Sequence, residues 1–540
     1  MSVFTSRVDT RSPEFKQNRD DMLALVEQLR ALEQRATDAS AKREARFRER
    51  GQLLPRERLN RLLDPGMPFL ELYNMANYLF EDTDPKTSVP GASAIAGIGF
   101  VSGVRCMVWV DDSGIRAGAA TSGTLPKVLG VLNMVIRHKL PLVHLVESAG
   151  ANLMGYQVEL WSQFGGVFYR LAQLSAAGLP NIVVLHGPST AGGAYMPGMS
   201  DYVIGVKGNG MAALGGAALV RAATGEVADE QQLGGSEMHA AVSGVIEYLA
   251  ENDDHGVQQA RKVVDALGWN DGCPSLPQRD FAEPVYSTDE IAGVVPTDIK
   301  KAYDAREVLA RLVDGSDFEE FKSRYGVSTV CATASIYGQT CGLICNNGPI
   351  DPNGAAKAGQ FIQLCDQANR PLIFLSNTTG YMVGTEYEQA GMIKHGSKMI
   401  QAVSNARVPR LTLYIGASFG AGNYGMCGYS YEPDFVFAWP NATTGVMGGE
   451  QAATTMSQVM RLSAKRRGQE VDEDAMRAQE ERLTAHFDGQ SGAFYTSGRA
   501  LDHGVIDPRD SRKVLGFALE VCWEARHRKT HPNVFGVSRF

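Results

Sequence analysis

Short runs of apolar, often β-branched residues alternate along this chain with longer segments whose apolar positions recur at helical spacing. Each short run is followed by Gly, Ser or Asn, a pattern typical of a buried strand that ends in a loop. Segments 125–138 and 393–404 lie between such runs and are predicted to be helices. The alternation of strands and helices predicts an α/β fold.

The pattern of the first half recurs in the second half. GVRCMVWVDDSG (103–114) aligns with GQTCGLICNNGP (338–349), LPLVHLVESAG (140–150) with RPLIFLSNTTG (370–380), and PNIVVLHGPSTAGGAY (180–195) with PRLTLYIGASFGAGNY (409–424). The offsets are 235, 230 and 229 residues. Such near-constant offsets predict two copies of one α/β domain. A polar stretch with Pro274, Pro277 and Pro284 places the boundary near 270–285, so the predicted domains are 14–275 and 285–540.

Residues 14–50 precede the repeats and are predicted to form a charged surface helix. Ser12 can cap this helix, and Pro13 suits its first position. One apolar stripe at helical spacing contains Met22, Leu25, Val26, Leu29 and Leu32. The stripe predicts that the helix docks on its own domain or on a neighbour.

Composition and charge narrow the functional class. Of the 540 residues, 44% are hydrophobic and 21% are charged, which is typical of a globular chain. The net charge of −8 argues against a nucleic-acid partner. No apolar window reaches about 18 residues and no secretory signal is visible, so we expect no membrane partner and a cytoplasmic location. The eight cysteines show no metal-binding spacing, so we expect buried, reduced thiols and no metal.

Two glycine-rich loops carry the strongest chemical signal. STAGGAYMPG (189–198) and SFGAGNYGMCG (418–428) each follow a predicted strand and are expected to open a helix. Small residues there let backbone N–H groups reach a ligand oxygen, as in an oxyanion hole. Tight strand–helix packing would explain one such loop, but the same pattern at the same place in both repeats favours a binding role.

Two common motifs overlap the second loop and are disfavoured. Residues 416–420 match the G-x-S-x-G elbow of serine hydrolases, with His486 and His503 downstream, but a second elbow at 187–191 is not expected in one hydrolase. Residues 420–425 match G-x-G-x-x-G, but no acidic residue follows at the dinucleotide-binding spacing. No acid–base pair accompanies either loop, so the substrate is expected to supply its own base.

Several long segments resemble the carboxyltransferase (beta) subunit of biotin-dependent acyl-CoA carboxylases, most closely the methylcrotonyl-CoA and geranyl-CoA branch. The segments that carry the resemblance are RGQLLPRERLNRLLDPGMPFLEL (50–72), STAGGAY (189–195), AATGE (222–226), LGGSEMH (233–239), NTTGYMVGTEYEQAG (377–391), GASFGAGNYGMCG (416–428), VMGGEQAA (446–453) and GVIDPRD (504–510). The resemblance implies two tandem homologous crotonase-like (ClpP-like) superhelical domains of α/β class.

The resemblance also implies the reaction and the partners. CO₂ would pass from carboxybiotin, carried on a partner chain, to an acyl-CoA whose enolate or dienolate attacks it. The biotin would belong to a biotin carboxylase/biotin carrier (alpha) subunit, because this chain has no biotinylation site of its own. The chain would form a homo-hexamer within a 6+6 assembly, with each site shared by two chains.

Site residues follow from the resemblance in the same way. The N–H groups of Gly192 and Gly193 would bind the thioester oxygen, and those of Ala421 and Gly422 the ureido oxygen of biotin. The biotin pocket would include Thr379, Gly380, Tyr381 and Gly420. The acyl-CoA side would include Arg116, Ala117, Gly118, Ala149, Gly150, Ala151 and Ala213.

The acyl-CoA side departs from the usual family pattern at three places. Arg116-Ala117-Gly118 stands where many members have Lys-Gly-Gly, Ala149 where they have Gly, and Ala213 where they often have Phe. A methyl group in place of a ring predicts a wide pocket and a branched or longer acyl chain, unless a methionine such as Met196 or Met211 fills the space. Two alternatives stay open: a non-catalytic ring or regulatory subunit, and a crotonase-like acyl-CoA hydrolase or hydratase.

Overall fold

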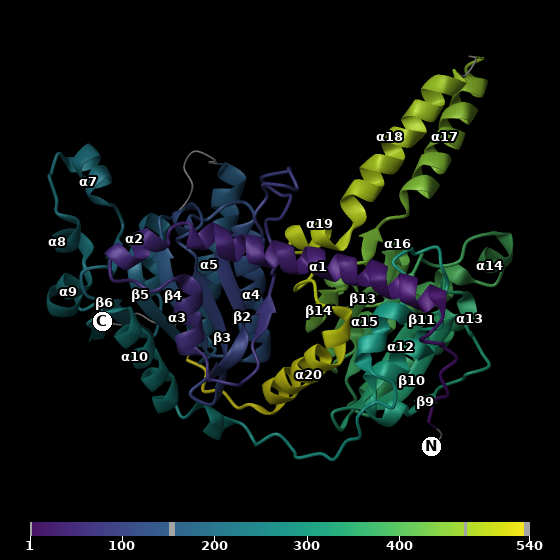
Figure 1. The fold of residues 1–540 in the computed structure, drawn as a ribbon, viewed down its shortest axis with the longest axis horizontal. Coiled ribbons are helices and arrows are strands. Elements are labelled where there is room, and N and C mark those ends of the chain that lie inside the picture. The colour runs from purple at the N-terminus through teal and green to yellow at the C-terminus, as the bar shows by residue number, and fades with distance from the viewer. Residues whose placement is uncertain (1–2, 151–156, 469–471, 534–540) are drawn as a thin grey trace. The chain divides into compact units, whose positions relative to one another are not determined.

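The computed structural model describes residues 3–150, 157–468 and 472–533 (Figure 1). Packing divides the chain into two compact units. The first unit contains Arg30–Leu276, Gly498–Ala500 and the chain from Val521 onward. The second unit contains the chain up to Leu29, Pro277–Ser497 and Leu501–Glu520. Helices α1 (Pro13–Ala41), α19 (Ala493–Gly498) and α20 (Ser511–His527) contribute residues to both.

The first unit is built on one eight-stranded sheet in the order β1-β2-β3-β4-β5-β6-β8, with β7 paired to β5. The first three strands are antiparallel neighbours, and the pairings from β3 to β8 are parallel. The strands are β1 (Leu70–Leu72), β2 (Ala94–Val101), β3 (Val104–Asp111), β4 (Leu142–Ser148), β5 (Asn181–Thr190), β6 (Tyr202–Val206), β7 (Met211–Ala213) and β8 (Tyr248–Ala250).

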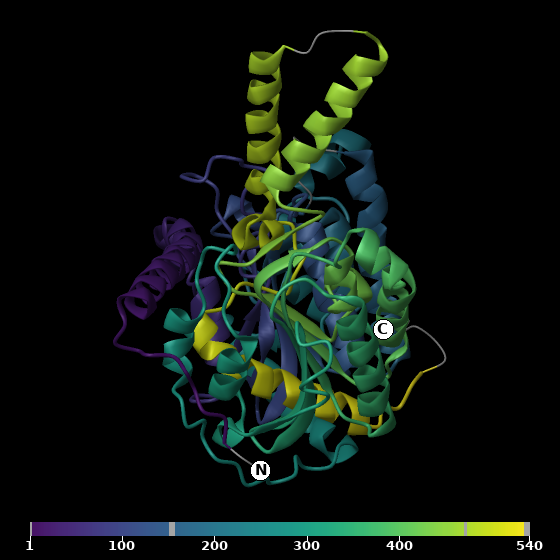
Figure 2. The same ribbon diagram turned by 90° about the vertical axis from the view of Figure 1, so that its right-hand side faces the viewer.

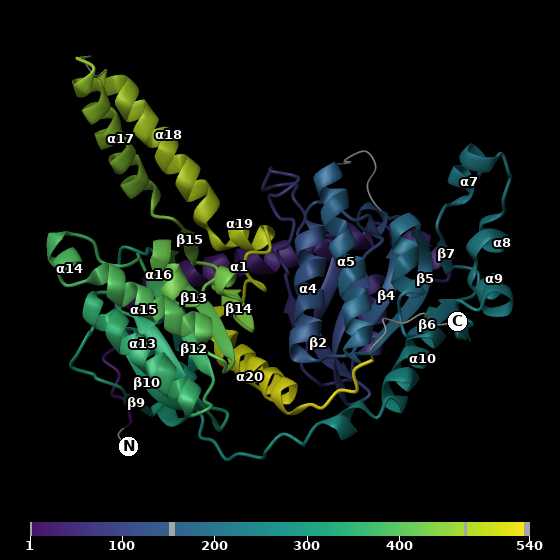
Figure 3. The ribbon, with the colours of Figure 1, turned by 180° about the vertical axis from the view of Figure 1, so that it is seen from behind.

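Helices cover both faces of this sheet. α3 and α10 lie on one face (Figure 1), and α4 and α5 cover the opposite face (Figure 3). The helices of the unit are α2 (Glu44–Glu49), α3 (Pro55–Leu62), α4 (Thr124–His138), α5 (Val158–Ala176), α6 (Tyr195–Gly198), α7 (Ala217–Thr224), α8 (Glu230–Gly234), α9 (Ser236–Met238) and α10 (Asp253–Ala266).

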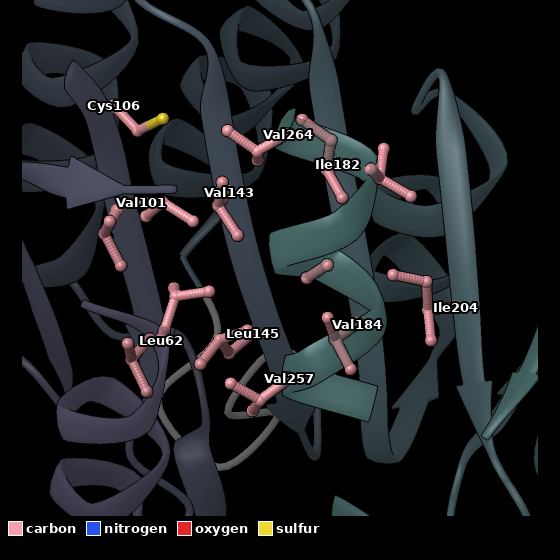
Figure 4. Close-up of a cluster of buried hydrophobic side chains, with 14 of the residues drawn as sticks. Leu62, Val101, Cys106, Val143, Leu145, Ile182, Val184, Ile204, Val257 and Val264 are labelled. Carbon is pink, nitrogen blue, oxygen red and sulfur yellow. The ribbon is translucent and has the colours of Figure 1, made fainter. Parts of the chain in front are cut away.

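The core beneath α3 and α10 explains why the strands are nearly continuous apolar runs. Side chains from β2 to β6 meet side chains of α3 and α10 there. The residues of this core are almost fully buried: Leu62, Val101, Cys106, Val143, Leu145, Ile182, Val184, Ile204, Val257 and Val264 (Figure 4). A parallel sheet that is covered on both faces requires apolar residues at successive positions. Most positions within these strands are therefore apolar.

The second unit repeats this topology. Its seven-stranded sheet has the order β9-β10-β11-β12-β13-β14, with β15 paired to β13. Its strands are β9 (Phe318–Glu320), β10 (Thr329–Ile336), β11 (Gln339–Asn346), β12 (Leu372–Thr378), β13 (Arg410–Phe419), β14 (Phe435–Ala438) and β15 (Thr443–Gly445). Both units shift strand register at one equivalent place, Val146/Ser148 and Ser376/Thr378. The predicted α/β class and the predicted duplication are confirmed.

The second unit has a longer helical periphery. Its helices are α11 (Ile291–Val294), α12 (Ala305–Leu312), α13 (Pro352–Gln367), α14 (Thr385–Gln389), α15 (Met392–Asn405), α16 (Gly420–Gly425), α17 (Gly449–Arg466) and α18 (Glu473–Ser491). α13 and α15 pack on the sheet through Phe361, Ile362, Met399 and Val403. α17 and α18 form a hairpin that projects from the sheet of its own unit (Figure 2).

The predicted N-terminal helix is interrupted. α1 ends at Ala41 and α2 begins at Glu44, so 14–50 forms two helices rather than one. At the break, the Ser40 hydroxyl donates to Asp112 Oδ1 at 2.6 Å. The turn lets Phe47 become buried, with the Arg58 guanidinium 5.8 Å from its ring centre. Tertiary contacts therefore override local helical preference here.

Candidate active site

The site of the first unit begins where β4 and β5 end. Ser148 lies in register with Ser189, and the two strands part after this pair. Their register shifts between Val146 and Ser148, which frees the following backbone from the ladder. Two glycine-containing segments, 116–118 and 192–193, therefore meet at the carboxyl edge of one sheet. This edge is the usual ligand-binding side of a parallel sheet.

Residues 116–118 form an unusual backbone bend next to this edge. Arg116, Ala117 and Gly118 have φ values of 50°, 54° and 67°, and a left-handed backbone is costly for residues with a side chain. The bend is held because Ala117 O accepts from Ala149 N at 3.0 Å and Gly118 O accepts from Ser148 Oγ at 2.6 Å. A Cβ on Gly118 would lie 2.5 Å from Glu147 O, so only glycine fits there.

The second segment opens a short helical turn. After β5, Ala191 adopts φ 54° and begins the 3₁₀ turn η3 (Ala191–Ala194). The first N–H groups of a helical turn have no partner inside it, and Gly192 and Gly193 supply two of them. Ser189 Oγ donates to Gly193 O at 2.9 Å and fixes the loop. The loop therefore presents backbone donors without side chains to cover them.

These segments share one largely apolar cavity of about 650 Å³. Four predicted residues line it: Gly118, Gly150, Gly192 and Gly193. Its walls come from α4 and α5, with Val128, Val131, Leu132, Phe164, Phe168 and Leu171, and from β3 and β4, with Trp109, Asp111, Leu142 and His144. Its lining places the cavity between the sheet and α4 and α5, the helices that Figure 3 shows covering this face of the sheet. The cavity can hold an extended apolar group with a polar end at the glycines.

Other predicted acyl-side residues lie elsewhere. Arg116 lines a separate, more polar pocket of about 360 Å³ and pairs with Glu81. Ala117 and Ala149 support the bend through their backbone without lining the cavity. Ala213 lies on β7, where it pairs with Thr190 of β5, and it does not line the cavity either. Other residues therefore form the walls of the cavity. Ala151 lies outside the described residues.

Two polar residues inside this cavity, His144 and Asp111, were not predicted from the sequence. His144 Nε2 lies 3.3 Å from Asp111 Oδ2, and Asp111 Oδ1 accepts from Trp109 Nε1 at 2.8 Å. Both His144 and Asp111 are 9% exposed. The available signal was a histidine in the otherwise apolar run LPLVHLV, on the same strand face as Ser148.

A second buried polar cluster lies next to the ends of β4 and β5. Arg58 on α3 donates to Glu147 Oε2 at 2.6 Å and to Asp253 Oδ2 at 2.8 Å. Asp253 also pairs with His186 Nδ1 at 2.8 Å. Burial opposes ionisation of Asp253, but His186 and Arg58 outweigh it and hold the pKa of this carboxyl well below its usual range. The cluster ties α3 and α10 to the strand ends that carry the cavity.

The second unit has the equivalent edge. Thr378 lies in register with Ser418, and α16 begins directly after β13. Gly420 has φ 55°, the same left-handed start as Ala191 in the other loop. Ala421 and Gly422 are the second and third residues of α16, whose first N–H groups lack helical partners.

The 379–381 segment packs directly against this loop. A Cβ on Gly422 would lie 2.8 Å from Gly380 Cα, so the two backbones touch. Gly380 itself has φ 123° and donates its N–H to Thr378 Oγ1 at 3.2 Å. Thr379 is exposed, while Tyr381 is partly buried and donates to Gly396 O at 3.3 Å. Thr379, Gly380, Tyr381 and Gly420–Gly422 thus form one cluster.

Among the residues that the structure describes, no histidine forms a hydrogen bond with Ser418. Ser418 is fully buried, and its Oγ lies 2.9 Å from Ser376 Oγ and 2.8 Å from Asn423 Nδ2. A hydrolytic serine needs a histidine within hydrogen-bond reach. The G-x-S-x-G match is therefore a packing motif, and the rejection of the hydrolase elbow agrees with the structure.

Comparison with known proteins identifies similar chains. Residues 46–536 match the Carboxyl transferase domain family. The chain is 45% identical to the probable biotin-dependent acyl-coenzyme A carboxylase beta2 subunit of Mycobacterium tuberculosis, over 92% of each chain. It is 40% identical to the mitochondrial methylcrotonoyl-CoA carboxylase beta chain of Arabidopsis thaliana, over 100% of this chain and 92% of that one.

A solved structure extends the similarity to the fold. The beta subunit of geranyl-CoA carboxylase from P. aeruginosa is 48% identical and covers 100% of both chains, with a TM-score of 0.93. Within the residues that the structure describes, no helix combines the length and apolarity needed to cross a membrane.

Proposed function

The chain belongs to the carboxyl transferase family, with its crotonase-like fold, and on that premise we propose which half of the reaction each unit performs. It is an enzyme of the biotin-dependent acyl-CoA carboxylase type, a carboxyltransferase (beta) subunit. In our proposal the first unit binds the acyl-CoA and the second unit binds biotin. The domain division that we propose for these roles is 14–275 and 285–540.

One observation carries the acyl-CoA assignment. Gly118, Gly150, Gly192 and Gly193 line the same apolar cavity, although they come from three separate loops. An acyl chain fits apolar walls, and a thioester oxygen fits the backbone donors of the 192–193 loop. As the thioester is enolised, negative charge develops on this oxygen, and fixed N–H donors stabilise it more than they stabilise the neutral carbonyl.

The second unit fits a biotin ureido group. Ala421 is exposed at the second position of α16. Its N–H lies at the N-terminal end of the helix, where it is available to a ligand acceptor. Gly422 and Gly380 leave no room for a side chain between the two backbones. Bound at this loop, the biotin group would supply the CO₂, and the ureido group left after CO₂ is released would take the proton that leaves the acyl-CoA. The role of this unit is to orient the ureido oxygen, which agrees with the lack of an acid–base pair at the loop.

The remaining parts of the proposal concern the assembly. We propose that the biotin arrives on a biotin carboxylase/biotin carrier (alpha) subunit. We further propose a homo-hexamer within a 6+6 assembly, located in the cytoplasm, with one chain giving Gly192 and Gly193 and another giving Ala421 and Gly422. A branched or longer acyl-CoA is the proposed substrate, because the cavity is apolar over most of its walls.

Co-purification tests this proposal. The tagged chain is expressed at its native level, isolated and probed with streptavidin. A biotinylated partner in stoichiometric amount is expected, and the purified pair should decarboxylate carboxybiotin only when acyl-CoA is added. A chain that consumes acyl-CoA alone, without biotin, would instead be a crotonase-like hydrolase or hydratase.

A further inference from the structure

The apolar cavity of the first unit contains a polar group that carboxyl transfer does not require. Leu142, His144 and Ser148 lie on one face of β4, and all three line the cavity. Ser148 is at the carboxyl end of β4, in register with Ser189 and close to the 192–193 loop. Because a strand rises about 3.3 Å per residue, the backbone of His144 lies about 13 Å farther along β4 than that of Ser148.

Asp111 holds the His144 ring in one orientation. Its Oδ2 lies 3.3 Å from His144 Nε2 and accepts from Glu147 N at 3.2 Å, while its Oδ1 accepts from Trp109 Nε1. The indole and imidazole rings meet edge to face with centroids 6.2 Å apart. The carboxylate is thus surrounded by donors, so the hydrogen of a neutral His144 resides on Nε2.

The other ring nitrogen of His144 is left without a partner. Among the residues that the structure describes, none forms a hydrogen bond with Nδ1, although His144 is only 9% exposed. Nδ1 itself is not fully buried and His144 lines the cavity, so water can reach this nitrogen until an acyl chain covers it. The surrounding walls are apolar: Val128, Val131, Leu132 and Leu142. A purely hydrocarbon acyl chain would leave Nδ1 unsatisfied.

We propose that His144, oriented by Asp111, determines specificity by binding a hydroxyl group near the far end of the acyl chain. This inference rests on the proposed acyl-CoA site and adds the chemistry of its substrate. The substrate class is then an acyl-CoA with an apolar body and a distal alcohol.

A hydroxyl suits this position better than other oxygen groups. It donates to Nδ1 of a neutral imidazole and accepts from Nδ1–H of a charged one, so it pairs with His144 in either state. A carbonyl can only accept, and it would leave the neutral imidazole unpaired. A carboxylate would bring a second negative charge close to Asp111 in a low-dielectric cavity.

The depth of the cavity sets the chain length. With the thioester at the 192–193 loop, the backbone spacing along β4 gives an upper limit of about 13 Å for a group that reaches His144, because Asp111 holds the His144 ring near Glu147. Roughly ten carbon–carbon bonds of an extended chain span this distance. The matching probes are decanoyl-CoA and 10-hydroxydecanoyl-CoA, with the six-carbon pair as a length control.

Titration calorimetry of the full chain with each probe tests the inference. Wild type should bind 10-hydroxydecanoyl-CoA at least about tenfold more tightly than decanoyl-CoA, because a site built for a hydroxyl discriminates against the analogue that lacks it. The six-carbon pair should show no preference. His144→Leu should reverse the ten-carbon preference, and His144→Gln, which keeps a hydrogen-bonding side chain, should retain part of it.

Two further variants complete the design. The double variant His144→Leu/Asp111→Asn removes the buried charge together with its partner and stays informative if His144→Leu folds poorly. Gln173→Leu changes an exposed residue of α5 that does not line the cavity, and it should leave the preference intact. Equal affinity of wild type for both ten-carbon probes, or a preference that survives His144→Leu, would overturn the inference. Binding needs no biotin, so this result is independent of whether carboxyl transfer itself is observed.

Discussion

At the scale of single residues, Gly193 offers the cleanest test of the backbone donors. A Cβ at this position would lie 3.0 Å from Ser189 Oγ, the end of a short side chain, so the fold should accept a substitution. Gly193→Val would place a branched side chain where the thioester oxygen approaches. Loss of one such donor costs about 10²–10³ in rate, so kcat/KM of the reconstituted enzyme should fall at least that far.

Gly198 provides the matched control for this substitution. A Cβ there would meet nothing within 4 Å, and Gly198 is a nearby glycine that does not line the cavity. Gly198→Val should keep most of the activity. If both valine variants lose activity equally, or neither does, the donor role of the 192–193 loop is wrong.

Ser418 tests the distinction between packing and nucleophilic chemistry. Ser418→Ala removes a buried hydroxyl and leaves Ser376 Oγ and Asn423 Nδ2 with one partner fewer. The expected cost is about 1–3 kcal/mol in the free energy of unfolding, with most of the carboxylation retained. An inactive Ser418→Ala with unchanged stability would indicate a nucleophilic serine.

Asp502 makes stability depend on pH. Burial raises the pKa of its carboxyl to about 7, although Ser497 Oγ and Gly504 N donate to it. Between about pH 4 and pH 7 the folded carboxyl holds a proton that the unfolded chain has released, so stability falls as pH rises through this window. Above about pH 7 the protein has lost all of the stability that the protonated Asp502 carboxyl contributes.

Asp502→Asn should remove this dependence. The amide oxygen can keep both hydrogen bonds, so the variant should gain on the order of a few kcal/mol over wild type between pH 4 and pH 8. Denaturant unfolding at several pH values measures the difference. A difference that stays constant with pH would show that Asp502 is ionised in the folded protein.

At the scale of elements, α3 is held by its buried arginine. Removing Arg58 would leave Glu147 as a buried carboxylate without a counter-ion and Asp253 with His186 as its remaining partner, so Arg58→Leu should cost about 3–5 kcal/mol. Arg61, one turn further along α3, pairs with Asp254 while half exposed. Arg61→Leu should cost less than about 1 kcal/mol. Similar losses in chemical unfolding of the two variants would contradict this role of the cluster.

The sequence predicted the repeated elements and the position of both glycine loops. Both glycine loops and the helices near 125–138 and 393–404 lie where the pattern places them, because period and small residues are local signals. The break after Ala41 depends on a contact between Ser40 and Asp112, which no local pattern reveals.

The polar pair in the cavity could not be predicted from local sequence pattern either. Asp111 and His144 come from adjacent strands, and their pairing depends on strand register. The separation of Ala213 from the cavity has the same origin, because β7 pairs with the outer side of β5 rather than with β4. Side-chain neighbours across a sheet require topology in addition to sequence.

At the scale of the whole molecule, the two units share one topology but differ in what their loops enclose. The first unit encloses an apolar cavity with one buried polar pair. The second unit brings Gly380 and Gly422 into backbone contact beside an exposed Ala421. In the proposed assignment, duplication of one fold lets two loops of the same design bind an acyl chain and a ureido ring.

Transfer of labelled CO₂ tests the central claim most directly. The chain, a biotinylated alpha subunit, ATP and ¹⁴C-bicarbonate are combined with an acyl-CoA, and acid-stable label in the CoA thioester is counted. The account predicts label that requires both the acyl-CoA and the biotinylated partner, and that is lost in Gly193→Val but kept in Gly198→Val. Label that forms without the biotinylated partner, or acyl-CoA that is consumed without incorporating label, would contradict it.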